Sequence, residues 1–290
     1  MNTTVIDLQM DIAASPEDVF HALTDSDTLK MWFAEEALVN PCENQYAFWG
    51  KFTPEAPNQE DGTHTLLSYE PPRHLKFDWH VKGTNTIVEF TLSPHHTGTL
   101  LSLMHHNVPD WQPGEYTIWD FWRVSLENLR CWVERKTVGG LCDFSTVMRG
   151  EVQLSIEIDA APEKVFEAIS DPEQLDRYIS HGAKVDLKVG GDYSFGWDPG
   201  GPQKVLEVEP AKKLSYSWRY EGEPDTVVTW ELEGSENRTR LTLVHSGFAP
   251  DTDDAGYRIG WTAYLNAIKS MSECGDNWQR VKTKTADFAS

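Results

Sequence analysis

Two histidines are the side chains of this sequence best suited to chemistry near neutral pH. His105 ends a strand-like alternation that begins at Leu101, and His245 ends a similar one that begins at Leu241. Alternate residues of a strand share a face, so both imidazoles are predicted to point inward with these leucines. A buried imidazole needs hydrogen-bond partners. Both are therefore interpreted as satisfied core histidines, with a polar anchor for a bound molecule and a general base as alternatives.

Catalytic and metal-binding patterns do not accompany these histidines. The sequence has no nucleophile elbow and no Ser/His/Asp spacing, so no catalytic residue is predicted. The adjacent pairs His95-His96 and His105-His106 would place neighbouring rings on opposite faces of a strand, which is unsuited to chelating one metal ion. There is no HExxH motif and no Cys/His cluster, so neither a metal nor a cofactor is expected.

Aromatic residues form the largest set of candidate site residues. Many fall on the predicted inward faces of strands and of two long helices, where they either fill a core or line an apolar pocket. The predicted ligand-binding residues of the first half are Trp32, Phe48, Phe77, Trp79, Phe90, His105, Trp119 and Trp122. Those of the second half are Tyr178, Tyr193, Phe195, Trp197, Tyr216, Trp218, Trp230, His245, Trp261 and Tyr264.

These residues are carried by an internal repeat. The stretch Ile12–Asp25 matches Ile158–Asp171, and Thr99–His105 matches Thr239–His245 in the same order. The offset falls from 146 (158 − 12) to 140 (239 − 99) because the first copy has an extra loop around Lys51–Asp61. We therefore predict two copies of one domain, each of about 140 residues. The predicted boundaries are domain 1 at 1–137, a linker at 138–150, domain 2 at 151–275 and a C-terminal tail at 276–290.

Each copy has the same predicted order of elements: one strand, two short helices, about six strands and one long helix. Ser15 before Pro16 is typical of a helix start, and Asp25 and Asp171 are typical caps for the second short helix of each copy. A curved antiparallel sheet wrapped around the long C-terminal helix would cover the apolar faces of both. The predicted class is therefore α+β.

Charge and composition exclude several classes of protein. The chain has 25 basic and 46 acidic residues, a net charge of −21, and its basic residues are scattered, so nucleic acid is not an expected partner. No stretch reaches the roughly 18 apolar residues of a membrane span, and we expect no signal peptide. Cys42, Cys131, Cys142 and Cys274 show no CxxC spacing. We expect free thiols and a cytoplasmic protein without membrane insertion.

The helix-start and turn motifs carry a resemblance to a known family. They are Ala14–Asp25 with Trp32-Phe33 and Glu70-Pro71 in the first copy, and Ala161–Phe166 with Glu209-Pro210 in the second. Over residues 5–136 and 151–274 the chain resembles the START-like (SRPBCC, helix-grip) superfamily, and within it the AHSA1-like family named for the activator of Hsp90 ATPase. The second copy has Tyr178-Ile179 where the family usually has Trp-Phe, which indicates that the two cavities differ.

The resemblance implies a cavity between the sheet and the long helix, which relatives use for lipids, hormones or aromatic polyketides. We expect a non-catalytic binding protein with an apolar, aromatic-lined cavity for a small hydrophobic ligand in one or both domains. One alternative is a protein-interaction module linked to an Hsp90-type chaperone. Another is a cyclase- or hydrolase-type enzyme that uses His105 or His245 as its base. The sequence is compatible with a monomer or a dimer.

Overall fold

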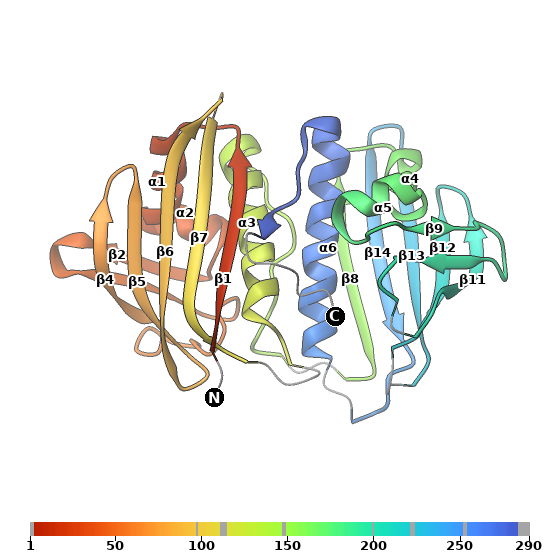
Figure 1. Cartoon of the computed structure of the whole chain (residues 1–290), viewed down its shortest axis with the longest axis horizontal. Coiled ribbons are helices and arrows are strands. Elements are labelled where there is room, and N and C mark those ends of the chain that lie inside the picture. Colours follow the sequence, from red (N-terminus) through yellow and green to blue (C-terminus); the bar gives the residue numbers. More distant parts are fainter. Residues whose placement is uncertain are drawn as a thin grey trace.

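The computed structural model describes residues 3–96, 98–110, 115–146, 149–198, 200–220, 224–251 and 254–283. Two antiparallel sheets form the outer sides of the molecule, and two long helices, α3 (Ile118–Arg135) and α6 (Ala255–Cys274), lie side by side between them (Figure 1). Each sheet with its long helix is one domain. The predicted α+β fold of two tandem helix-grip domains is confirmed.

The elements of domain 1 follow the predicted order. They are β1 (Thr3–Ile12), α1 (Pro16–Thr24), α2 (Ser26–Trp32), β2 (Glu36–Asn40), the 3-10 turn η1 (Pro41–Glu43), β3 (Gln45–Trp49), β4 (Thr63–Glu70), β5 (His74–Val81), β6 (Thr84–His95), β7 (Gly98–Pro109) and α3. The strands pair antiparallel in the order β1-β7-β6-β5-β4-β3-β2. This order leaves the inner face of the sheet to be covered by α3.

Domain 2 repeats this arrangement with shorter outer strands. Its elements are β8 (Glu151–Ile158), α4 (Pro162–Ser170), α5 (Pro172–Tyr178), β9 (Lys184–Val185), β10 (Asp192–Ser194), β11 (Gln203–Glu209), β12 (Lys213–Trp218), β13 (Thr226–Ser235), β14 (Arg238–Ser246) and α6. The sheet order is β8-β14-β13-β12-β11-β10-β9, which matches that of domain 1 strand for strand.

The predicted capping residues start the short helices. The Ser15 side chain accepts a hydrogen bond from the backbone N–H of Asp18 at the start of α1. Asp25 accepts one from Thr28 at the start of α2, and Asp171 caps α5 in the same way. Each cap satisfies a backbone donor that the first helical turn leaves without a partner. Local sequence therefore fixes where these helices begin.

The two domains are joined through α3 and α6, which run in the same direction. Asn128 of α3 and Asn266 of α6 both donate to the carbonyl oxygen of Gly140, at 2.9 and 3.0 Å. Their own side-chain oxygens accept from the N–H groups of Gly139 and Gly140. An added Cβ at Gly139 would stand 2.2 Å from the Asn266 side chain, so only glycine fits there. The linker is thus clamped between the domains.

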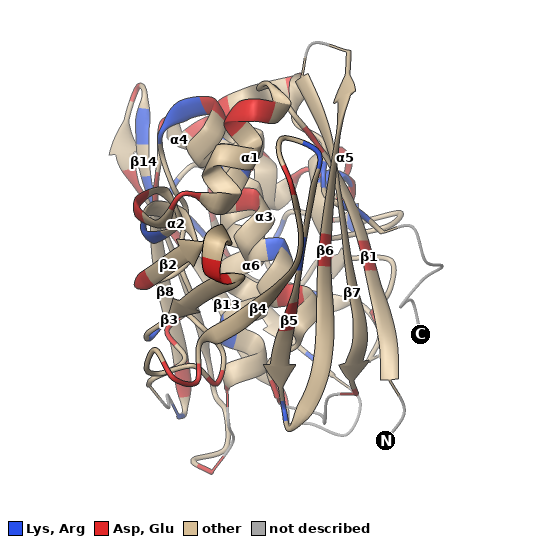
Figure 2. Cartoon of the chain, turned by 90° about the vertical axis from the view of Figure 1, so that its left-hand side faces the viewer, with Lys and Arg blue, Asp and Glu red and all other residues tan. Residues whose placement is uncertain are grey.

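The C-terminal tail returns from domain 2 to domain 1. After the 3-10 turn η2 (Gly275–Asn277), Trp278 is buried, and β15 (Lys282–Thr283) pairs with β1. The Trp278 indole donates to Glu127 of α3 at 3.2 Å. Figure 2 shows acidic and basic positions interleaved over the helices and strands of domain 1. Within the described ranges, no helix is long and apolar enough to cross a membrane.

Candidate functional site

His105 is the centre of a hydrogen-bonded chain inside domain 1. The Trp122 indole Nε1 of α3 donates to His105 Nδ1 at 3.0 Å. Because Nδ1 accepts, the proton of the neutral ring lies on Nε2, which donates to Thr86 Oγ1 at 2.7 Å. The Thr86 hydroxyl in turn donates to the Trp79 carbonyl at 2.6 Å. This chain links the long helix to three strands and uses every ring nitrogen.

Domain 2 contains the same chain. Trp261 Nε1 of α6 donates to His245 Nδ1 at 3.0 Å, and His245 Nε2 lies 2.8 Å from Thr226 Oγ1. The Thr226 hydroxyl donates to the Trp218 carbonyl, at a longer 3.3 Å. In both copies the threonine lies 19 residues before the histidine. Sequence reasoning missed both threonines, and this repeated spacing was the signal that could have found them.

Both histidines are therefore neutral structural groups in this geometry. Burial lowers the pKa of His105 to about 3, with a small contribution from nearby His106, and burial alone lowers the pKa of His245 to about 3. A general base must have a lone pair within reach of its substrate. Here the accepting nitrogen of each ring is already bonded to an indole. The geometry matches the satisfied core histidine.

The interior of domain 1 is filled by aromatic rings. Phe121, the residue before Trp122, is buried, and its ring centroid lies 5.4 Å from Trp79, 5.2 Å from Trp122 and 5.7 Å from Phe33. The predicted residues Phe48, Phe77 and Phe90 are buried in the same core. Sequence reasoning did not single out Phe121, and it quoted Phe33 only as part of the family motif, although both rings extend the predicted ligand-binding set.

A long loop closes this end of domain 1. Residues 50–62 connect β3 to β4, and Thr53 and Ala56 within it are buried. Glu55 accepts hydrogen bonds from the backbone N–H of Lys82 at 2.6 Å and from the Tyr116 hydroxyl at 3.1 Å. Phe144 of the linker packs against Phe121, with ring centroids 6.2 Å apart. Loop and linker together shield the rings from water.

Domain 2 has smaller residues at two of the positions that fill this end of domain 1. Gly260 precedes Trp261 where Phe121 precedes Trp122, and Ile179 follows Tyr178 where Phe33 follows Trp32. A Cβ added at Gly260 would have no described atom within 4 Å. This comparison leaves out the two chain neighbours of Gly260 and the backbone of α6 within four residues. A side chain at residue 260 could therefore leave α6 without a clash at its Cβ, where domain 1 has the buried Phe121.

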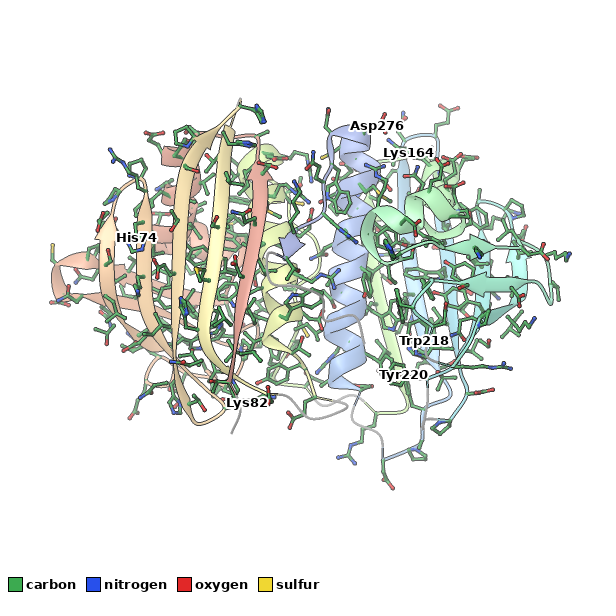
Figure 3. All side chains as sticks on the ribbon, viewed as in Figure 1. His74, Lys82, Lys164, Trp218, Tyr220 and Asp276 are labelled. Atoms are coloured by element: carbon green, nitrogen blue, oxygen red, sulfur yellow. The ribbon has the colours of Figure 1, made fainter. Side chains whose placement is uncertain are left out.

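Two tryptophans of domain 2 lie at this open end. Trp197 is 38% exposed and stacks on Phe195, with ring centroids 5.1 Å apart. Trp218 is 8% exposed, whereas its counterpart Trp79 is 1% exposed. The buried Trp218 Nε1 has no hydrogen-bond partner among the described residues. Figure 3 shows Trp218 beside Tyr220 at the lower end of domain 2.

Several other predicted aromatic residues have their polar groups bound within the protein, whereas the buried Trp119 Nε1, like that of Trp218, has no hydrogen-bond partner among the described residues. The Trp32 indole donates to the Ala22 carbonyl at 3.0 Å, and the Tyr193 hydroxyl donates to the Ile169 carbonyl at 2.7 Å. The Trp230 indole donates to the Tyr216 hydroxyl at 3.1 Å. The first contact joins α2 to α1, the second anchors β10 to α4, and the third joins β13 to β12.

Trp119 and Tyr264 contribute to the junction between the domains. The Arg123 guanidinium lies 4.6 Å from the Trp119 ring centroid and 4.8 Å from that of Tyr264. This cation–π arrangement joins α3 to α6. Tyr178 is buried beside Tyr264, with ring centroids 6.2 Å apart, so the Tyr264 ring also borders the core of domain 2.

Two hollows in the described part of the chain lie at the surface. One, of about 190 Å³, is bordered by β1, His95 and the tail residues Gln279, Arg280 and Lys282. The other, of about 360 Å³, is bordered by Glu55, Lys82, Glu115, Tyr116 and Ala255. Neither involves a predicted ligand-binding residue. Among the described side chains, no group of three His, Cys, Asp or Glu residues could hold a metal ion.

Comparison with protein families gives one match, repeated in the chain. The family described as Activator of Hsp90 ATPase homolog 1-like protein matches residues 13–134 and 159–273. These segments lie within the two structural domains. A comparison with curated proteins gave no match.

Comparison with solved structures gives several proteins that each match about 40% of this chain. A protein from Mesorhizobium loti is 28% identical, covers 43% of this chain and 98% of its own, and has a TM-score of 0.38. An Hsp90 activator from Plasmodium falciparum is 29% identical over 36% of this chain and 76% of its own, with a TM-score of 0.32. An Aha1 dimer from Colwellia psychrerythraea is 25% identical over 44% of this chain and 98% of its own, with a TM-score of 0.38.

Proposed function

The chain belongs to the family of Activator of Hsp90 ATPase homolog 1-like proteins, and on this premise we propose that it is a non-catalytic binding protein whose domain 2 holds a small apolar molecule between its sheet and α6. One observation carries the proposal: no described atom lies within 4 Å of the Cβ position at Gly260, where domain 1 has the buried Phe121, and the next residue, Trp261, contacts Trp218. An apolar molecule gains free energy by leaving water for such a surface. In this proposal domain 1 binds no ligand and has a structural role in the two-domain chain.

The described titratable side chains near Trp218 are engaged or stay neutral, which supports binding rather than catalysis. His245 is neutral and both its nitrogens are engaged, so it offers no base to a molecule beside Trp218. Burial raises the pKa of Tyr178 and of Tyr216, so both phenols stay protonated at neutral pH. The described side chains of the site offer apolar contacts and hydrogen bonds, which is typical of a protein that carries or senses a ligand.

Ligand uptake tests this proposal directly. Mass spectrometry of the intact chain from its native host, under native and then denaturing conditions, should show an extra mass that leaves on denaturation. Adding the released compound back should raise the melting temperature in proportion to the logarithm of its concentration. A Gly260→Phe variant, which fills the site with the side chain that domain 1 uses, should lose both effects. Equal uptake by this variant would contradict the proposed location.

A second candidate function follows from the family match. We propose an Hsp90-type chaperone as an alternative partner, with exposed apolar residues at the outer edge of domain 2 as its contact surface: Leu187, Val189 and Leu206. Exposed apolar residues in one region are typical of protein-interaction surfaces. The full chain should then stimulate the ATPase of the Hsp90-type chaperone of its host. A Val189→Asp variant should lose this effect, and an unstimulated ATPase would exclude this candidate.

A further inference from the structure

The C-terminal tail and the outer face of the domain 1 sheet enclose one of the two surface hollows, with a volume of about 190 Å³. We propose that this hollow binds a small oxyanion, either free phosphate or the phosphate group of a small molecule, and that the bound oxyanion fastens the tail to domain 1. This site is separate from the apolar site proposed for domain 2.

The hollow forms where the tail returns to the edge of β1. Lys282 of β15 pairs with Gln9, so the tail runs antiparallel along β1 (Figure 1). Gln9 and Asp11 lie on the outward face of β1, because Met10 between them is buried and alternate residues of a strand share a face. Arg280 precedes Lys282 by two residues and borders the hollow with it. Two cationic side chains of the tail therefore border the outward face of β1.

The charges around the hollow favour an anion. Its titratable side chains are Asp11, His95, Arg280 and Lys282. Asp11 Oδ1 lies 2.7 Å from His95 Nδ1, and Asp11 Oδ2 lies 3.9 Å from Lys282 Nζ. Even with His95 neutral, the two tail cations exceed the one carboxylate, in a chain whose net charge is −21. The hollow is therefore a local positive site on an acidic protein, and such a site attracts anions.

Arg280 is the side chain that a ligand can recruit without breaking a contact. Its exposed guanidinium makes no ion pair or side-chain hydrogen bond with any residue that the structure describes. A guanidinium presents a planar fork of N–H donors that matches two oxygens of a phosphate or carboxylate. Lys282 adds an ammonium group and Gln279 an amide to the same hollow. Three donors suit a phosphate, which has more acceptor oxygens than a carboxylate.

Oxyanion binding and docking of the tail are thermodynamically linked. The ladder between β15 and β1 has only two residue pairs, and both of its tail residues are exposed. Arg280 and Lys282 border the hollow only while the tail lies on β1. A ligand that binds only the docked tail stabilises this docking. Because the tail follows α6 of domain 2, the oxyanion would strengthen the connection between the two domains.

An NMR titration of the full chain with sodium phosphate, compared with sodium chloride at the same ionic strength, tests the site. We expect saturable shifts of the signals of Asp11, His95 and Arg280, the Arg280 Nε–H included. At a phosphate concentration about ten times the Kd, amide exchange in β15 should be about tenfold slower. Glycerol 3-phosphate is the second probe. Tighter binding of this ester would assign the site to the phosphate group of an organic molecule, and tighter binding of free phosphate would assign it to the ion.

Three variants test which side chains bind the oxyanion. Arg280→Ala should weaken phosphate binding about tenfold, the size of one charge-assisted hydrogen bond. Lys164→Ala also removes one exposed positive charge, but from α4 of domain 2 (Figure 3), and should leave the affinity unchanged. Asp11→Asn should strengthen binding about threefold, because it removes the negative charge beside the ligand. Misfolding could not produce such a gain.

The outcomes that would overturn the proposal are distinct. Phosphate titrations without saturable shifts at the hollow would overturn the site. Equal losses of affinity in Arg280→Ala and Lys164→Ala would show a general attraction to positive charge and would also overturn it. Phosphate binding without slower exchange in β15 would overturn the link to the tail. Gly260→Phe should leave phosphate binding unchanged, so the result does not depend on the apolar site of domain 2.

Discussion

Domain 1 and domain 2 share one scaffold but differ at one end of their interiors. Both hold the long helix to the sheet through a Trp–His–Thr chain, at His105 and at His245. Domain 1 fills the adjacent space with Phe121 and covers it with the loop 50–62. Domain 2 has Gly260 there and leaves Trp197 half-exposed. The comparison separates the residues that the two copies share from those at which one end of their interiors differs.

The two interiors also differ in a buried titratable group. His64 of β4 pairs with Tyr46 of β3, and Gln203 of β11 takes the same register opposite Tyr193 of β10. The buried Nε2 of His64 has no partner among the described residues, whereas the Gln203 side chain accepts from the Arg219 N–H at 2.8 Å. Domain 1 therefore carries one more neutral buried histidine than domain 2.

The largest expected effect comes from exchanging the residues that fill or open the two interiors. Phe121→Gly should lower the free energy of unfolding by about 4 kcal/mol, because it removes a buried ring and leaves a cavity. Gly260→Phe should have a small or stabilising effect, because its Cβ meets no described atom and a glycine is removed from a helix interior. Urea denaturation of the full chain measures both changes. Equal destabilisation by the two variants would refute the difference between the interiors.

Lowering the pH should reduce the free energy of unfolding through His64, a buried histidine that domain 2 lacks at the matching position. Burial lowers the pKa of His64 to about 4, against a weak opposing effect of Asp78, so the unfolded chain binds its proton more readily. This contribution to stability is complete above the unfolded pKa near 6.5 and is lost as the pH falls toward 4. Between pH 7 and 5, His64→Gln should reduce the loss of unfolding free energy by about 2 kcal/mol. Urea denaturation at both pH values tests this, and identical pH profiles would contradict it.

The smallest expected difference between the two domains concerns the two threonines. Thr86→Val should cost about 1–3 kcal/mol, because it leaves the His105 N–H and the Trp79 carbonyl unpaired. Thr226→Val should cost less, because the bond from Thr226 to the Trp218 carbonyl is longer, at 3.3 against 2.6 Å. Thr86→Ser keeps the hydroxyl and serves as the control. Thermal unfolding ranks the three variants, and a larger cost in domain 2 would reverse the comparison.

Much of the fold could be predicted from local sequence. The caps at Ser15, Asp25 and Asp171 and the alternation of strand residues are local patterns, and they define helix starts and buried faces correctly. The repeat itself gave the two domains. The candidate site was harder to predict from the sequence. Periodicity selects aromatic residues that share a face of a strand or helix, but it does not show which of these rings pack in the core and which line a cavity.

The sequence by itself determined the α+β class, the duplication and the inward direction of His105 and His245, because these depend on periodicity and on short-range caps. Only the tertiary structure decided that both histidines are saturated with hydrogen bonds, since their partners come from other elements. It also decided that the tail joins the sheet of domain 1. The open space at Gly260 is a property of packing, which depends on residues that are distant in sequence and meet only in the folded chain.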